Sequence, residues 1–132
     1  MTGTGKGEIK MDVLLSIKPE FVAEMRLGKK KYEFRKRIFK RQKVEKVIIY
    51  ESAPTSKVVG EFAITNVLEE KPNVLWEKTK NYAGISKFFF DQYFRGKETA
   101  IAIAFDKFEE YSEPRTLKEL GLKAAPQSFV YI

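Results

Sequence analysis

The chain has 132 residues, 43% of them hydrophobic and 33% charged, and it contains neither histidine nor cysteine. This length and composition are typical of one globular domain. The two missing residue types exclude a Ser–His–Asp triad, a cysteine nucleophile, a zinc site with Cys or His ligands and a disulfide framework. Acid–base chemistry therefore depends on Lys, Glu, Asp, Tyr or backbone groups, and we expect no cofactor and no metal.

The first ten residues differ in composition from the rest of the chain. They are rich in Gly, Thr and Lys and have no apolar stretch, so they do not form a signal peptide. Residues 1–10 are interpreted as a flexible leader, or as a remnant of expression with Met11 as the natural start. Residues 11–132 are expected to form a single domain. The longest apolar run, residues 100–105, is far shorter than the ~20 residues of a membrane span, which predicts a cytoplasmic protein without a membrane partner.

A strand, a helix and a second strand are predicted in the first part of the sequence. The apolar run at residues 12–18 predicts a strand. Pro19 and Gly28 then stand where proline favours the start of a helix and where glycine favours the position just past its end. Residues 31–37 alternate between charged side chains and the aromatic pair formed by Tyr32 and Phe34. This alternation predicts a strand with the aromatic pair in the core.

The rest of the sequence predicts more strands than helices. The strands are expected at residues 47–50, 58–67, 99–108 and 128–132. The helices are expected at residues 72–80, 87–94 and 116–120. Gly60, inside a predicted strand, indicates a bulge or a bend. Because strands and helices do not alternate regularly, the pattern favours the α+β class, with a small barrel-like sheet and helices at its edges.

Positive charge is concentrated in one stretch of the chain. Residues 29–46, here called the cationic segment, contain ten Lys or Arg and two Glu, a net charge of +8, whereas the whole chain carries +7. A cluster of this density attracts polyanions and releases their counterions on binding. The plain alternative is a solvated face that only keeps the protein soluble.

The stretch GKKKYEFR, from Gly28 to Arg35, resembles a known signature. The pattern Gly-x-Lys-x-x-Glu-x-Arg after a short helix is similar to that of the ASCH domain, the activating-signal-cointegrator homology domain of the PUA-like superfamily. Further stretches agree in the same order: SIKP at 16–19, YESAP at 50–54 and VVGE at 58–61. NYAGIS at 81–86 and PQSFVYI at 126–132 resemble a prokaryotic or viral subgroup. The resemblance spans residues 13–132.

This resemblance implies a small PUA-like β-barrel of five to six mixed strands with flanking short helices, and a cleft between barrel and helices. It implies binding of RNA or of a modified nucleotide, with DNA as an alternative partner, and a role in regulating transcription or translation. Some members are hydrolases: one small group removes acyl groups from acetylated cytidine, and others have been described as ribonucleases. No oligomeric state follows from the sequence.

The signature also implies site residues, because Lys30, Glu33 and Arg35 face the cleft in the family. By alternation, Arg37 shares the face of Glu33 and Arg35. Cations in a cleft bind phosphate, and arginine does so through two nitrogens. Glu33 either accepts a hydrogen bond from a base amino group or forms an ordinary cross-strand ion pair with Lys or Arg. Lys18, at the end of the first strand, is expected beside the cleft.

Further candidates lie outside the signature. Ser86 stands at the N-cap position of a predicted helix, where it either helps to bind an anion or only caps the helix. Tyr82 either stacks on a base or packs under its own loop. Gln127 and Ser128 either read a base edge or hydrogen-bond within the protein. Of the phenylalanines at 88–90, at least two are expected to be buried because a helix has one core face.

The alternative function is a small hydrolase acting on acylated nucleosides or RNA, an amidohydrolase or a ribonuclease, with Lys30 and Glu33 as catalytic residues. A desolvated lysine, or one beside other cations, has a lowered pKa and acts as a base or a nucleophile. The amidohydrolases that this sequence resembles carry threonine at the position of Glu33, and a distant glutamate where residues 81–86 stand. These departures favour a binding module over an enzyme.

Overall fold

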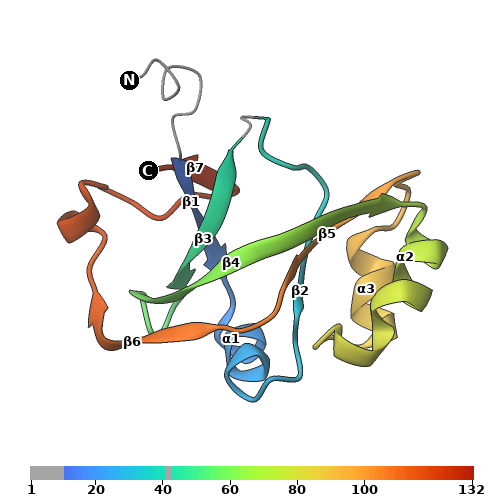
Figure 1. Ribbon diagram of the computed structural model, residues 1–132, viewed down its shortest axis with the longest axis horizontal. Coiled ribbons are helices and arrows are strands. Elements are labelled where there is room, and N and C mark those ends of the chain that lie inside the picture. The colour runs from blue at the N-terminus through green and yellow to red at the C-terminus, as the bar shows by residue number, and fades with distance from the viewer. Residues whose placement is uncertain (1–10, 41–42) are drawn as a thin grey trace, which may run out of the picture.

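A computed structural model describes residues 11–40 and 43–132 (Figure 1). The predicted leader, residues 1–10, lies outside the described residues. The elements follow in this order, with η marking a 3-10 turn: β1 (Met11–Ile17), α1 (Pro19–Arg26), β2 (Tyr32–Arg35), β3 (Val44–Glu51), β4 (Lys57–Glu70), α2 (Pro72–Thr79), η2 (Lys80–Tyr82), α3 (Lys87–Tyr93), β5 (Ala100–Phe105), β6 (Glu109–Arg115), η3 (Lys118–Leu120) and β7 (Phe129–Tyr131). Across the described ranges, no helix is long and apolar enough to cross a membrane.

The seven strands form one mixed sheet. The strand order is β2–β5–β4–β3–β1–β7, with β6 paired to β4 beside this path. The β1–β3 pair is parallel and the other described pairs are antiparallel. Strand β4, fourteen residues long, crosses the molecule and joins its two ends (Figure 1): its first part pairs with β3 and β6, and its second part pairs with β5. A mixed sheet with three short α-helices agrees with the α+β prediction.

The sheet does not close into the barrel of five to six strands that was predicted. In the described structure, no backbone ladder joins its end strands, β2 and β7. Side chains bridge this seam instead. Arg35 Nη2 donates to the carbonyl oxygen of Ser128 at 3.0 Å, and the backbone N–H of Lys40 donates to the hydroxyl oxygen of Tyr131 at 3.0 Å. Strand β2 is only four residues long, so it ends before a ladder to β7 begins.

Strand β6 was not predicted, because its sequence is mostly polar and its residues are largely exposed. Gly60 of β4 lets it pack closely. A Cβ atom at Gly60 would lie 2.5 Å from the carbonyl oxygen of Glu109 and 2.6 Å from the ring of Phe108. The registers of β4 with β3 and with β6 both shift between Val58 and Gly60. The bulge predicted at Gly60 is therefore confirmed.

One hydrophobic cluster packs α1 onto the sheet, and another packs α2 and α3 onto it. One packs Val22 and Met25 of α1 onto β1, β3, β4 and β5. The other joins Phe34 of β2 to α2, α3 and the start of β5, with Tyr32 partly buried against it. The predicted core position of this aromatic pair is confirmed. The charged face of β2 lies between α1 and α3 as a result.

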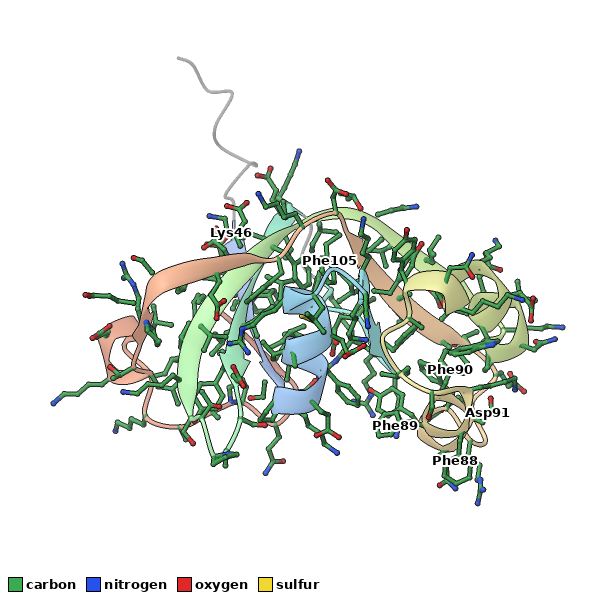
Figure 2. All side chains as sticks on the ribbon, turned by 90° about the horizontal axis from the view of Figure 1, so that it is seen from below. Lys46, Phe88, Phe89, Phe90, Asp91 and Phe105 are labelled. Carbon is green, nitrogen blue, oxygen red and sulfur yellow. The ribbon has the colours of Figure 1, made fainter. Side chains whose placement is uncertain are left out.

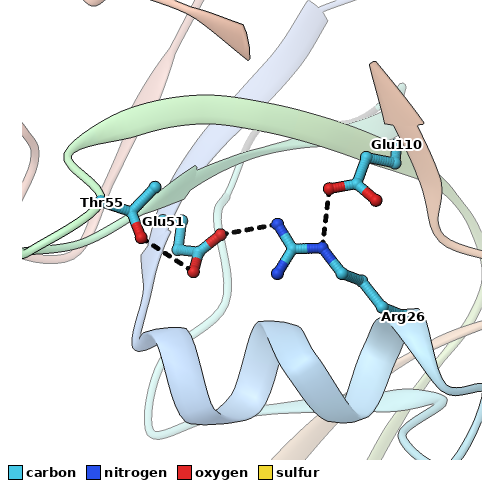
Figure 3. Close-up of polar contacts among 4 residues, drawn as sticks. All are labelled: Arg26, Glu51, Thr55 and Glu110. Atoms are coloured by element: carbon cyan, nitrogen blue, oxygen red, sulfur yellow. Dashed lines mark hydrogen bonds and ion pairs between the residues drawn. The ribbon is translucent and has the colours of Figure 1, made fainter. Parts of the chain in front are cut away.

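An ion-pair network fastens α1 to the sheet (Figure 3). Arg26 Nη2 donates to Oε1 of Glu51, the last residue of β3, at 2.8 Å, and Arg26 Nε donates to Oε2 of Glu110 in β6 at 2.7 Å. The Thr55 hydroxyl donates to the second oxygen of Glu51 at 3.0 Å. Glu51 is only 5% exposed. Its carboxylate therefore depends on these donors, because a buried charge without partners is costly.

The substitution Arg26→Leu removes the guanidinium and leaves Thr55 as a side-chain donor to Glu51. We expect the free energy of unfolding, measured by urea denaturation, to fall by about 2 kcal/mol. The control is Glu110→Gln, which alters an exposed partner of the same arginine and should cost less than about 1 kcal/mol. Equal losses in the two variants would contradict the importance of the buried carboxylate.

Candidate functional site

A pocket of about 190 Å³ lies where the end of β1 and the start of α1 meet β2 and α3. This volume is below the roughly 300 Å³ at which pockets for drug-sized ligands begin, so the pocket is a small one. Its polar lining side chains are Ser16, Lys18, Lys30, Glu33 and Arg35. Its aromatic lining side chains are Phe21, Phe34, Phe89 and Tyr93. Four of the residues predicted for the site therefore meet in one place.

Lys30 is 2% exposed, the least exposed of the charged side chains that the structure describes. Its ammonium donates to the carbonyl oxygen of Ala83 at 2.8 Å and lies 4.9 Å from the ring centre of Phe34 and 5.6 Å from that of Phe21. Burial lowers the pKa of Lys30 from 10.5 to about 8, against the opposing charge of Glu33. Near pH 8 much of the amine is therefore neutral and able to accept a proton.

Gly84 makes room for the Lys30 side chain. Its φ is +68°, and a Cβ atom there would overlap Cβ of Lys30 and lie 2.5 Å from its Cγ. The two segments are also joined by their backbones. The N–H of Lys31 donates to the carbonyl oxygen of Tyr82 at 2.8 Å, and Lys30 forms an isolated β-bridge with Ala83. The loop after η2 thus determines where the ammonium lies.

Glu33 and Arg35 project from the same face of β2, as their alternation predicts. Glu33 is 7% exposed, and its Oε2 lies 3.4 Å from Nη1 of Arg35. The other terminal nitrogen of Arg35 donates to the carbonyl oxygen of Ser128. Glu33 is therefore in an ion pair, but with a residue of its own strand and not across strands, and a carboxylate and a guanidinium lie side by side in the pocket lining.

Helix α3 contributes two aromatic residues that the sequence analysis did not propose for the site. Phe89 and Tyr93 are one helical turn apart, and their rings are nearly parallel, at 11°, with centres 6.4 Å apart. The ammonium of Lys18 lies 5.6 Å from the ring centre of Phe89, and that of Lys36 lies 4.6 Å from the ring centre of Tyr93. Burial raises the pKa of Tyr93. In the sequence, the i, i+4 spacing of Phe89 and Tyr93 indicates that the two rings share one helix face.

The three phenylalanines of α3 point in different directions (Figure 2). Phe88 is 74% exposed and points away from the body of the protein, whereas Phe90 is buried in the core. Phe89 is half-buried and lines the pocket. The expectation that at least two of them are buried was wrong, because consecutive helix residues point about 100° apart, and these three face solvent, the pocket and the core in turn.

Ser86 and Tyr82 do not line the pocket. The Ser86 hydroxyl accepts a hydrogen bond from the N–H of Phe89 at 3.1 Å, so it caps α3. Tyr82 is 48% exposed, and the ammonium of Lys31 lies 4.9 Å from its ring centre. These two residues shape the loop that holds Lys30 rather than the pocket itself.

Three further predicted residues also lie outside the lining. Arg37 follows the end of β2 and is exposed. Gln127 and Ser128 are exposed as well, and Ser128 meets Arg35 through its backbone carbonyl. The strand alternation that grouped Arg37 with Arg35 fails because β2 ends at Arg35.

The cationic segment does not gather at the pocket as a whole. Lys30 and Arg35 are its members in the lining. Lys46 instead pairs with Glu61 on β4 at 3.0 Å, and Lys31 lies 3.7 Å from the carboxylate of Asp106. Arg41 is outside the described residues. The lining thus carries three cations, with Lys18 as the third, and one carboxylate. Among the described residues, no cluster of three acidic side chains is arranged to hold a metal.

The substitution Gly84→Ala should lower the free energy of unfolding by more than about 2 kcal/mol, because the new methyl group overlaps Lys30 and φ is positive. Gly96 supplies the matched control. Its φ is +78°, but a Cβ there has no neighbour within 4 Å, so Gly96→Ala should cost only about 1 kcal/mol. Urea denaturation of both variants makes the comparison. Equal costs would show that the Lys30 side chain has room to move.

Comparison with known proteins places this chain in a family. The ASCH domain family model matches residues 15–109. Over 90 residues the chain is 36% identical to large ribosomal subunit protein uL22 of Ureaplasma parvum, covering 68% of this chain and 29% of that protein. Over 93 residues it is 30% identical to an ASCH domain-containing ribonuclease of Zymomonas mobilis, covering 70% of this chain and 63% of that protein.

Solved structures agree with the sequence comparison. The crystal structure of ASCH from Zymomonas mobilis superposes with a TM-score of 0.82 at 27% identity, covering 92% of this chain and 87% of that one. The chain spans less than two thirds of the length of the curated relatives described above. The match over residues 15–109 confirms the resemblance found in the signature. The chain belongs to the ASCH domain family.

Proposed function

We propose that this chain binds RNA, or a modified nucleotide, and takes one base into the pocket between β2 and α3. The observation that carries the proposal is the combination, in a single pocket, of aromatic rings with three cations and a carboxylate. Aromatic rings stack on bases, and cations bind the phosphates beside them. The ribonuclease among the relatives supports RNA as the ligand. A regulator of transcription or translation would act through such binding.

Each pocket residue has a role in this proposal. The ring of Phe89 stacks on the base, while Glu33 accepts hydrogen bonds from an exocyclic amino group. Arg35 and Lys18 bind the phosphate, because they are the pocket cations with exposed surface. Lys30 donates to an acceptor atom of the base from the floor of the pocket.

Fluorescence anisotropy with a labelled single-stranded RNA tests the proposal. Affinity should fall steeply from low to moderate salt, because each contacted phosphate releases counterions. Arg35→Gln should weaken binding about tenfold, whereas Lys118→Gln, on η3 at the opposite end of the molecule (Figure 1), should leave it unchanged. An affinity that does not depend on salt would refute the phosphate contacts. A large loss of melting temperature in Arg35→Gln would assign that residue a structural role instead.

Hydrolysis of RNA is a second candidate, favoured by the pKa of Lys30 near 8 and by the same relative. In this reaction the neutral amine of Lys30 removes the proton from a ribose 2′-hydroxyl. The resulting oxygen attacks the adjacent phosphorus, the bond from phosphorus to the 5′-oxygen breaks, and the leaving oxygen takes a proton from water. Glu33 stabilises the lysine cation that forms, because its carboxylate faces the same pocket.

The pH dependence of cleavage distinguishes this candidate from binding alone. Only the neutral amine is a base, so the rate should rise as pH increases and level off above about 8. Lys30→Met should abolish cleavage, and the same protein controls for contaminating nucleases. An RNA with a 2′-deoxy substitution at the cleaved nucleotide should bind but stay intact. A rate that is independent of pH between 6 and 9, or unchanged in Lys30→Met, would exclude Lys30 as the base.

A further inference from the structure

Directly after the pocket residue Arg35, the chain carries three cations for which the described structure shows no ion pair. The chain leaves β2 at Arg35, and Lys36, Arg37 and Lys40 follow, all exposed. Within residues 11–40 and 43–132, none of these three side chains takes part in an ion pair. Other members of the cationic segment are neutralised, as Lys46 is by Glu61. Positive charge therefore remains available where the chain runs away from the pocket.

An aromatic ring stands beside the first of these cations. Tyr93 of α3 lines the pocket and is half-buried, and the ammonium of Lys36 lies 4.6 Å from its ring centre. The charges of Arg35 and Glu33 both act on the Tyr93 hydroxyl, so this group lies beside the proposed base site. Tyr93 thus connects the pocket to Lys36. A ring next to an ammonium is the pairing that single-stranded nucleic acid requires, because each nucleotide offers a planar base and an anion.

We propose that Tyr93 and Lys36 form a second nucleotide subsite, so that the ligand is a single strand of at least two nucleotides. This inference rests on the proposed binding of a base in the pocket. The neighbouring base stacks on Tyr93, and Lys36 and Arg37 bind its phosphate. The Lys36 ammonium moves from the ring to the phosphate when the base arrives, since its side chain is exposed and has no ion pair with the described residues.

The subsite has two consequences for the choice of ligand. A ring stacks on any base, so the position next to the pocket should accept all four bases about equally. A duplex should bind poorly, because its bases are already paired and stacked and the pocket, at about 190 Å³, is small. A free mononucleotide should reach only the pocket and leave the three cations unused.

Calorimetric titration with three RNA probes tests the subsite: a mixture of the four 5′-mononucleotides, a single-stranded trinucleotide and a blunt duplex. We expect the trinucleotide to bind wild-type protein at least about tenfold more tightly than the mononucleotides. Lys36→Gln should lower the affinity for the trinucleotide but not that for the mononucleotides. It should also reduce the slope of log affinity against log salt by about 0.7, the value of one phosphate contact on a single strand. Lys118→Gln is the control with the same change of charge, and it should match wild type.

Substitutions at Tyr93 separate stacking from folding. Tyr93→Phe keeps the ring but loses the hydrogen bond between the hydroxyl and the backbone of Lys36, so it should bind the trinucleotide more tightly than Tyr93→Leu, which should bind it about tenfold more weakly than wild type. If Tyr93→Leu does not fold, the result for Lys36→Gln decides. Equal affinities for mononucleotide and trinucleotide, or a trinucleotide affinity unaffected by Lys36→Gln, would overturn the subsite and leave the pocket proposal standing. No binding of any probe would overturn the proposed function itself.

Discussion

The ammonium of Lys30 is placed where almost no water reaches it, and the surrounding fold compensates for this burial. The carbonyl oxygen of Ala83 accepts its hydrogen bond, and the rings of Phe21 and Phe34 lie close to it. These partners come from α1, β2 and the loop after η2. A buried charge without such partners would destabilise the fold by several kcal/mol. The relative positions of these three segments, which form walls of the pocket, therefore depend on their contacts with the Lys30 ammonium.

The same burial determines what chemistry the pocket can perform. Few polar groups surround the Lys30 amine, so its protonated form is disfavoured and its pKa falls to about 8. Protonated, the amine is a hydrogen-bond donor in the pocket lining; neutral, it is able to accept a proton. The two proposed functions, binding and hydrolysis of RNA, would use the same pocket and would differ in the proton that Lys30 carries.

The open seam of the sheet also has a role at this site. Ser16 and Arg35 line the pocket, and each also donates to a backbone carbonyl of the C-terminal segment, at Pro126 and Ser128. That segment therefore borders the pocket, although no ladder ties it to β2 in the described structure. A ladder there would use the backbone groups that the two side chains now contact. A short β2 leaves the last part of the chain as a rim beside the pocket.

Local patterns in the sequence determined β1, α1 and the two faces of β2, because proline and glycine placement and strand alternation act over a few residues. The signature around Lys30, Glu33 and Arg35 likewise lies within eight residues. Tertiary structure decided what stands opposite them. Strand alternation predicts which face of the strand a side chain occupies, but not which distant residue it meets. Phe89 and Tyr93, more than fifty residues after β2, come to line the same pocket only through tertiary packing. Strand β6 was missed for the same reason: it is held by β4 and carries no hydrophobic period of its own.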